Sequence, residues 1–470
     1  MEEARTRRAL FGVVLAIFLA AIESTVVATA MPTIVASLGG IDVYSWVFSG
    51  FLLTATVTMP LWGRLSDLFG RRRTFLTGLT IFLAGSALSG VAQDMVQLIV
   101  FRMLQGLGAG SLMTIGMTII GELFGLERRA KMQGYISGVY GVASLLGPLI
   151  GGFLADHVSW RWVFYLNLPI GAVAMALIAS ALRDETPQRR RPVIDYAGLA
   201  LFTVGVTALL VGVMEVGRSG VWTRVDVVLP LVVAVVTLAV FVPVERRAPE
   251  PMVPLHLLRN RVVLAAAVTG FLAGTAMFGA ISFVPLFMQD VVRTTATGAG
   301  FVLTPFVLGW IALSIASARA VLRIGYRTVV LGGMICLTLA FFLMSRWDAT
   351  LTQGGAMSHG LLAGIGMGMN MVPMLIAVQS AVPRADLGAA TAMTQFFRTI
   401  GGAVGLSLMG AVMTQRLGAG LPMVEALHGV FVVGLLVSLA AFASAFLVPP
   451  GRAQDLARAD VRGEPTRAGG

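Results

Sequence analysis

Long apolar segments, each about the length of a membrane span, recur along almost the whole chain. A helix needs roughly 20 mostly apolar residues to cross a bilayer, and short polar or charged stretches separate the segments here. We expect spans at residues 9–36, 45–67, 74–92, 96–121, 132–155, 160–182, 196–216, 227–245, 262–289, 297–318, 328–345, 354–379, 388–415 and 426–448. A count of twelve would require the seventh and eighth to lie outside the membrane, and their uniform Val, Leu and Ala content argues against that.

Composition supports the same fold class. Of the 470 residues, 57% are hydrophobic and 12% charged, and the mean hydropathy is +0.87. Soluble domains carry about 25% charged residues. We therefore expect an all-α polytopic membrane protein with no separate soluble catalytic domain, and no enzyme.

The distribution of the positive charge decides what it means. A net charge of +11 would suggest nucleic acid for a soluble chain. Here most of the 34 Lys and Arg fall in alternate loops, as the positive-inside rule predicts when both termini are cytoplasmic. The arginines in predicted external segments are Arg161, Arg218, Arg224, Arg293, Arg346 and Arg416. We expect a multi-pass protein of the plasma (inner) membrane that contacts lipids and binds no nucleic acid.

Two further classes of site find no support in the sequence. The lone lysine, Lys131, is not part of a phosphate-binding G-x-x-x-x-G-K-[ST] loop. The histidines lie far apart along the chain, without the spacing of a zinc site. We expect no metal and no cofactor.

The loop at residues 63–73, Gly-Arg-Leu-Ser-Asp-Leu-Phe-Gly-Arg-Arg-Arg, lies between the second and third spans. Gly63 and Gly70 allow a tight turn and close packing. Asp67 can accept hydrogen bonds from arginines or from a helix N-terminus, and Arg71, Arg72 and Arg73 hold the loop on the cytoplasmic side. One interpretation assigns the loop only this retention role.

The joint spacing of glycine, aspartate and arginine resembles the pattern G-x-L-x-D-x-x-G-R-[KR] of major facilitator superfamily transporters. Leu68 departs from that pattern, which usually has Arg there. The resemblance implies a cytoplasmic gate, in which we place Glu122 as an acidic partner and the start of the thirteenth span near Gly388 as a neighbour of Asp67. The gate residues are then Gly63, Asp67, Gly70, Arg71, Arg72 and Glu122.

The span layout resembles the fourteen-span drug:proton antiporter family within that superfamily. We expect a six-helix bundle at 1–182, a linker with two extra transmembrane helices at 183–260, a second six-helix bundle at 261–448 and a disordered cytoplasmic tail at 449–470. The run Gly106-Leu-Gly-Ala-Gly110 parallels Gly364-Ile-Gly-Met-Gly368, and the segment 319–327 lies where a second gate loop would fall, without an Asp. A degenerate second copy is what two parallel repeats would leave.

Glu23 places a carboxylate in the middle of the first span. An ionisable residue in hydrocarbon is costly and indicates a functional site. Desolvation favours the neutral form of a carboxylate, as a site that binds and releases a proton requires. The resembled family usually has Asp here, so Glu23 keeps the acid with one more methylene. Two interpretations stay open: proton coupling, and a static ion pair with Arg102.

Arg102 lies within the fourth span, in Arg102-Met-Leu-Gln105-Gly106-Leu-Gly108. A guanidinium cannot lose its charge by titration, so it needs an acid, a carbonyl or a water-filled cavity. The run resembles the family motif R-x-x-Q-G-x-G, whose arginine is associated with the proton path. The resemblance thus assigns proton coupling to Glu23 and Arg102; a buried pair that fixes helix register is the alternative.

The fifth span contains Gly147-Pro148-Leu-Ile-Gly151-Gly152. Glycines one turn apart allow close helix approach, and Pro148 removes a backbone hydrogen bond and is expected to kink the span. The run resembles the G-P-x-x-G-G motif associated with antiporters and less with symporters, so it favours export; generic close packing is the alternative. The segment 159–171, which includes Asn167, also resembles the family, and we expect a structural role for it.

The second half carries its own intramembrane polar residues. Arg398 lies in Gln395-Phe-Phe-Arg398-Thr-Ile-Gly-Gly, which resembles the thirteenth span of the family. It would pair with a carboxylate, contact an anionic substrate or bind carbonyls, and the sequence does not separate these. Gln395 and Asn370 are candidate cavity residues, although such amides more often form interhelical hydrogen bonds.

These observations predict a proton-coupled antiporter that exports lipophilic compounds by alternating access. Cations are among the candidates because Glu23 is the acid expected in a cavity. The alternatives are export of lipids or siderophore-like metabolites by the same fold, and import of a nutrient by proton symport. We expect a monomer whose partners are a small lipophilic substrate, protons and membrane lipids, with the proton as the coupling ion.

Overall fold

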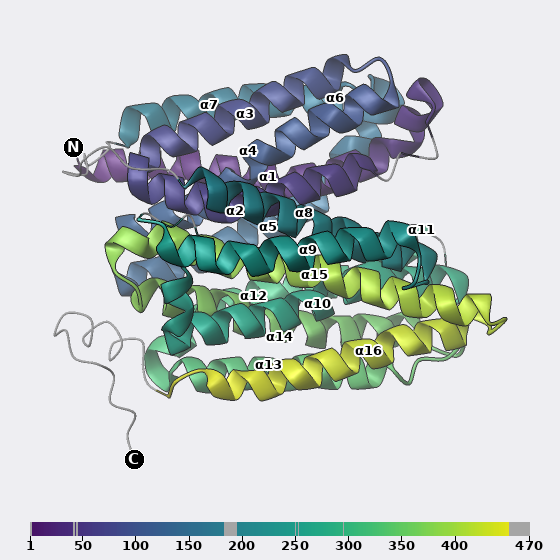
Figure 1. The fold of residues 1–470 in the computed structure, drawn as a ribbon. Coiled ribbons are helices and arrows are strands. Elements are labelled where there is room, and N and C mark those ends of the chain that lie inside the picture. Colours follow the sequence, from purple (N-terminus) through teal and green to yellow (C-terminus); the bar gives the residue numbers. More distant parts are fainter. Residues whose placement is uncertain are drawn as a thin grey trace. The chain divides into compact units, whose positions relative to one another are not determined.

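The computed structural model describes residues 2–40, 43, 46–182, 195–249, 251, 253–294 and 296–450, and every regular element in these ranges is a helix (Figure 1). The α-helices are α1 (Glu2–Leu38), α2 (Trp46–Phe69), α3 (Arg71–Val91), α4 (Met95–Leu123), α5 (Leu126–His157), α6 (Trp162–Tyr165), α7 (Asn167–Ala181), α8 (Tyr196–Ser219), α9 (Val225–Arg247), α10 (Arg261–Asp290), α11 (Ala296–Val302), α12 (Thr304–Ile324), α13 (Tyr326–Met344), α14 (Gln353–Ser380), α15 (Leu387–Gly418) and α16 (Met423–Ser444). Residues 183–194 of the predicted linker and residues 451–470 of the predicted tail lie outside the described residues.

Thirteen helices of the described part are long and apolar enough to cross a membrane. In hydrocarbon, a helix satisfies its backbone hydrogen-bonding groups internally, which is why such segments form helices. The chain is therefore a multi-pass membrane protein with about thirteen spans. α5 coincides with the fifth expected span but is not one of the thirteen, so the count of fourteen stays a prediction, as does the orientation of the termini.

Two expected spans are each divided into two helices. α6 and α7 meet at Leu166, and α11 and α12 meet at Leu303. A proline follows each break, Pro169 in the first turn of α7 and Pro305 at the start of α12. Proline lacks the N–H that would bond back into the preceding turn, and it is tolerated in the first turn, where that N–H has no partner.

The helices group into two compact units. The first comprises residues 1–125, 135–195 and 384–392; the second comprises 126–134, 196–383 and 393–470. In the first, α2 and α3 pack on α4, and α1 packs on α7; in the second, α12 and α13 pack on α14, and α10 packs on α16 (Figure 1). The same pairings thus recur in each unit, while the predicted domain limits stay predictions.

The two glycine runs show the same repeat at atomic detail. In the run Gly106–Gly110 of α4, a Cβ on the first or third glycine would meet the backbone of α2, and a Cβ on the second would meet α3. In the run Gly364–Gly368 of α14, the first and third face α12 and the second faces α13. Small residues let helix backbones approach closely, and both runs use this in the same alternating order.

The extra pair, α8 and α9, belongs to the second unit. The two helices pack on each other, and α8 packs against α15. A Cβ on Gly217 would lie 2.9 Å from the Cα of Ser407, and Gln415 Nε2 donates to the carbonyl of Gly220 at 2.7 Å. The pair therefore supports α15 along its second half.

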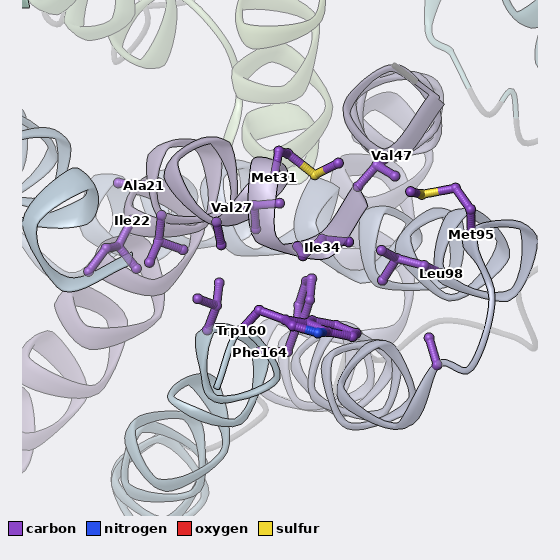
Figure 2. Close-up of a cluster of buried hydrophobic side chains, with 14 of the residues drawn as sticks. Ala21, Ile22, Val27, Met31, Ile34, Val47, Met95, Leu98, Trp160 and Phe164 are labelled. Carbon is purple, nitrogen blue, oxygen red and sulfur yellow. The ribbon is translucent and has the colours of Figure 1, made fainter. Parts of the chain in front are cut away.

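A cluster of buried apolar side chains fills part of the first unit (Figure 2). It draws on α1, α2, α4, α5 and α6, on the residue after α3 and on the turn before α6. Its labelled members are Ala21, Ile22, Val27, Met31, Ile34, Val47, Met95, Leu98, Trp160 and Phe164. Glu23 follows Ile22 on α1, so its carboxylate borders a tightly packed apolar region.

Candidate functional site

α1 and α4 bring Glu23 and Arg102 into direct contact. Glu23 is 0% exposed and Arg102 is 1% exposed, and Arg102 Nη1 forms an ion pair with Glu23 Oε1. Two charges this far from water each carry a desolvation cost of several kcal/mol, and removing one partner leaves the other uncompensated. The structure thus places the two residues predicted for proton coupling at one site.

Arg102 has further partners besides the carboxylate. Its Nη1 donates to Gln105 Oε1 at 2.7 Å and its Nε to the carbonyl of Val47 at 3.3 Å. The guanidinium carbon also lies 4.1 Å from the centroid of the Phe51 ring, a favourable position for a cation. Arg102 therefore has acceptors other than the carboxylate of Glu23.

The second carboxylate oxygen of Glu23 contacts α7. Asn167 Nδ2 donates to Glu23 Oε2 at 2.6 Å and to Ser86 Oγ at 2.9 Å, and Ser86 Oγ donates to the carbonyl of Phe164 at 2.8 Å. The sequence pattern predicts only a structural role for the segment around Asn167. It does not predict the contact of Asn167 with Glu23. The available signal was an amide in an apolar run just before Pro169.

Asp67 lies at the N-terminus of α15. Its carboxylate oxygens accept from the backbone N–H groups of Gly388 at 3.0 Å and Ala389 at 2.8 Å, and Arg71 Nη1 lies 2.5 Å from Oδ1. All four residues belong to the first unit. A carboxylate is stabilised at a helix N-terminus by the unpaired N–H groups and the helix dipole, so Asp67 acts as a cap from another helix.

Arg71 extends this network to α4. It lies 2.7 Å from Glu122 Oε1 through Nη2 and donates to Ser66 Oγ at 2.6 Å. Gly63 permits the close approach of α2 and α15, because a Cβ there would lie 2.6 Å from the carbonyl oxygen of Gly388. Of the predicted gate residues, the structure thus joins Asp67, Arg71 and Glu122 in one network, beside Gly63. Arg72 lies half-buried in the first turn of α3.

The second gate loop keeps the turn but loses the acid. Gly70 begins α3 with φ of 93°, and Gly325 begins α13 with φ of 85°; only glycine adopts this region readily. Buried Tyr326 stands where the first loop has Arg71. The N-terminus of α5, capped at Gly125, has no side-chain hydrogen bond. Among the described residues, the capping carboxylate of a gate loop is Asp67, in the first unit.

The Gly-Pro run of α5 packs on α1. A Cβ on Gly147 would lie 1.9 Å from Thr25 Oγ1, and one on Gly151 would lie 2.3 Å from the carbonyl oxygen of Val26. Gly152 has no atom within 4 Å of that position. Two glycines one turn apart therefore form the contact, next to Glu23 along α1, and the third does not. Pro148 lies on the same helix, and the kink expected there stays a prediction.

This difference gives a matched pair of variants. We expect Gly151→Ala to destabilise the protein by about 1–3 kcal/mol, because overpacking at a backbone contact forces the helices apart. We expect Gly152→Ala to be neutral or to stabilise by up to about 1 kcal/mol, since Ala is the better helix former. Thermal unfolding of the purified variants measures both, and equal effects would contradict the assigned contact.

The polar residues predicted for the second half lie on α14 and α15. Arg398 Nη1 lies 3.8 Å from Met371 Sδ, and Met371 follows Asn370 on α14. Asn370 and Gln395 are 2% and 4% exposed, and Asn370 Oδ1 has no hydrogen-bond partner among the described residues. The three alternatives for Arg398 stay open.

Two histidines that are distant in sequence meet at Trp347, at the end of α13. Trp347 Nε1 donates to His359 Nδ1 at 2.8 Å, and His428 Nε2 contacts the carbonyl of Trp347. Within the described ranges, no group of three or more His, Cys, Asp or Glu residues could hold a metal. This cluster ties the loop after α13 to α14 and α16.

Comparison with known families and proteins adds to this geometry. The family described as Major Facilitator Superfamily matches residues 13–406. A multidrug transporter protein of Bacillus subtilis, MdtP, is 39% identical over 408 residues, 87% of this chain and 75% of that protein. Multidrug resistance protein 3 of the same organism is 35% identical over 88% of this chain and 81% of its own length.

Solved structures with low sequence identity share the fold. The human organic anion transporter MFSD10 has a TM-score of 0.68 at 18% identity, covering 94% of this chain and 99% of that one. The proton:xylose symporter XylE has a TM-score of 0.64 at 12% identity, covering 93% and 95%. The sequence match, the fold and the gate motif agree: the chain belongs to the Major Facilitator Superfamily of membrane transporters.

Proposed function

We propose that the chain is a fourteen-span drug:proton antiporter that exports lipophilic compounds, with cations among its substrates. Its place would be the plasma (inner) membrane, with both termini cytoplasmic, and its partners would be the substrate, protons and membrane lipids. Relatives named multidrug transporter and multidrug resistance protein support the substrate class. The resemblance of the Gly-Pro run, which packs on α1, to the motif associated with antiporters supports export over uptake.

The observation that carries the proposal is the buried pair of Glu23 and Arg102. Of the two, only Glu23 can change charge, because the guanidinium stays protonated. The remaining acceptors of Arg102, Gln105 and Val47, stabilise it while Glu23 is neutral. A carboxylate held in this way can load a proton on one side of the membrane and release it on the other during alternating access.

A substrate panel in proteoliposomes with an imposed pH gradient tests this function. The panel contains lipophilic cations, neutral lipophiles, lipophilic anions, phospholipids and a hexose. We expect lipophilic compounds to move uphill, opposite to the proton flux, and to reverse direction when the gradient is reversed. A membrane potential would add a driving force of about 2.3 kcal/mol per 100 mV for each elementary charge that crosses the membrane.

The possible results separate the alternatives. Movement of the hexose together with protons would replace antiport by symport. Movement of phospholipids alone would assign the chain to lipid export. Transport that ignores the gradient in either direction would contradict proton coupling altogether.

A further inference from the structure

Asn167 occupies a position that the proton-coupling proposal does not yet use. It is the first residue of α7 and is 1% exposed. Its Nδ2 donates to both Glu23 Oε2 and Ser86 Oγ, while its Oδ1 is buried and has no hydrogen-bond partner among the described residues. The amide nitrogen thus makes two hydrogen bonds, and the amide oxygen makes none to the described residues.

The arrangement matches an ionised Glu23. A carboxylate only accepts hydrogen bonds, and each oxygen of Glu23 faces a donor, Arg102 on one side and Asn167 on the other. A neutral Glu23 needs an acceptor for its new O–H group. The proton cannot be accommodated at Oε1, because Arg102 always donates there. It must sit at Oε2, facing Asn167.

We propose that Asn167 is a positioning residue for the proton site: it donates to Glu23 when the acid is ionised and reverses its amide to accept from Glu23 when the acid is protonated. This inference rests on the proposed function, in which Glu23 takes up the coupling proton. Rotation of the amide by half a turn exchanges Oδ1 and Nδ2 at nearly the same two points. Asn167 Oδ1 then accepts a hydrogen bond from the protonated Oε2 of Glu23. The N–H groups of Asn167 no longer point at the O–H group of the acid.

The reversal changes the bonding of Ser86 as well. Its hydroxyl carries one proton and now donates it to the carbonyl of Phe164. Once the amide oxygen faces Ser86, the hydroxyl turns to donate to Asn167 and releases Phe164. Phe164 belongs to the apolar cluster that packs on α1 (Figure 2), so the protonation of Glu23 reaches the turn between α6 and α7.

Few charges compete for this site. Among the described contacts of Glu23, α4 supplies the one other charge, Arg102. The groups around the partners of Glu23 are neutral. The Val47 carbonyl of α2 accepts from Arg102, the Ser86 hydroxyl of α3 accepts from Asn167, and the Phe164 carbonyl of α6 accepts from Ser86. From α5, Tyr140 packs against the neighbouring apolar cluster.

Asn167→Leu removes both functions of the amide at similar volume. We expect the pH midpoint of gradient-driven transport to rise by about one unit, because a hydrogen bond to a charged group is roughly twice as strong as one between neutral groups. Ser86→Ala, which loosens the amide without removing it, should shift the midpoint in the same direction by less. Ser89→Ala is the matched control: Ser89 is also buried on α3 but bonds within its own helix, to Gly85.

Infrared difference spectroscopy of the full-length protein in lipid reads the amide directly. Lowering the pH should produce a carboxylic acid band that Glu23→Gln abolishes, together with a change in an asparagine side-chain carbonyl band. Isotope-labelled asparagine identifies that band, and Asn167→Leu should remove it. If Asn167→Leu does not fold, Ser86→Ala should still weaken the asparagine signal.

The outcomes separate this inference from the proposed function. If Asn167→Leu and Ser86→Ala both leave the midpoint and the spectra unchanged while Glu23→Gln abolishes the acid band, the positioning role is wrong and the proton site stands. If the acid band persists in Glu23→Gln, the proton site itself is wrong.

Discussion

Glu23→Gln is expected to abolish uphill transport driven by a pH gradient, while counterflow of substrate and substrate binding persist. Glutamine has nearly the same shape as glutamate but does not bind and release a proton. Proton movement across the membrane therefore no longer drives the substrate uphill. The variant leaves Arg102 without a counter-charge, and breaking a buried pair costs about 3–5 kcal/mol. The contacts of Arg102 to Val47 and Gln105 offset part of that cost. Proteoliposomes with and without an imposed gradient measure both forms of transport.

Two controls accompany this variant. Glu23→Asp keeps the acid that the family pattern usually has and should retain gradient-driven transport at a reduced rate. Glu215→Gln removes the acid of a peripheral pair with Arg218 and should leave transport unchanged. Unimpaired uphill transport by Glu23→Gln would show that the buried pair is static.

Asp67→Asn is expected to slow turnover by about tenfold or more with little change in apparent substrate affinity. The carboxylate accepts two backbone N–H groups of α15 and pairs with Arg71. Hydrogen bonds to a charged group contribute about 1.5–3 kcal/mol each, and 1.4 kcal/mol corresponds to a tenfold change in an equilibrium constant. α15 begins in the first unit and continues in the second, so releasing its N-terminus shifts the conformational equilibrium of the transport cycle.

Initial transport rates at a series of substrate concentrations give the maximal rate and the half-saturating substrate concentration of each variant separately. Asp226→Asn is the control, since Asp226 forms an exposed pair with Arg224. An effect of Asp67→Asn that is confined to the half-saturating substrate concentration would assign Asp67 to substrate binding and remove it from gating.

The placement of the long helices followed from the apolar pattern, because the bilayer fixes the length of each span. The ends and breaks were less predictable. α1 begins at Glu2 and not at residue 9, since the charged first turns continue the helix, with Arg7 paired to Glu3 one turn away at 2.8 Å. Prolines mark the breaks before Pro169 and Pro305, yet Pro60 and Pro373 lie inside unbroken helices. Proline alone therefore did not locate the breaks.

Part of the candidate site could be anticipated from charge. An acid in the first span and an arginine in the fourth each need a partner in hydrocarbon, and Glu23 and Arg102 do meet. Asn167 could not be placed in this way, because a neutral amide creates no such demand and lies 144 residues from Glu23 along the chain. The tertiary packing of α7 on α1 alone brings it to the carboxylate.

Proton release on substrate binding tests the central claim most directly. The purified full-length protein is mixed with saturating substrate in weakly buffered detergent solution, and a pH indicator counts the protons released, starting from a pH at which infrared spectra show the acid band of Glu23. We predict up to about one proton per bound substrate from the wild type and none from Glu23→Gln, which still binds the substrate. Equal release by Glu23→Gln, or binding to the wild type with no release at any starting pH, would contradict proton coupling at Glu23.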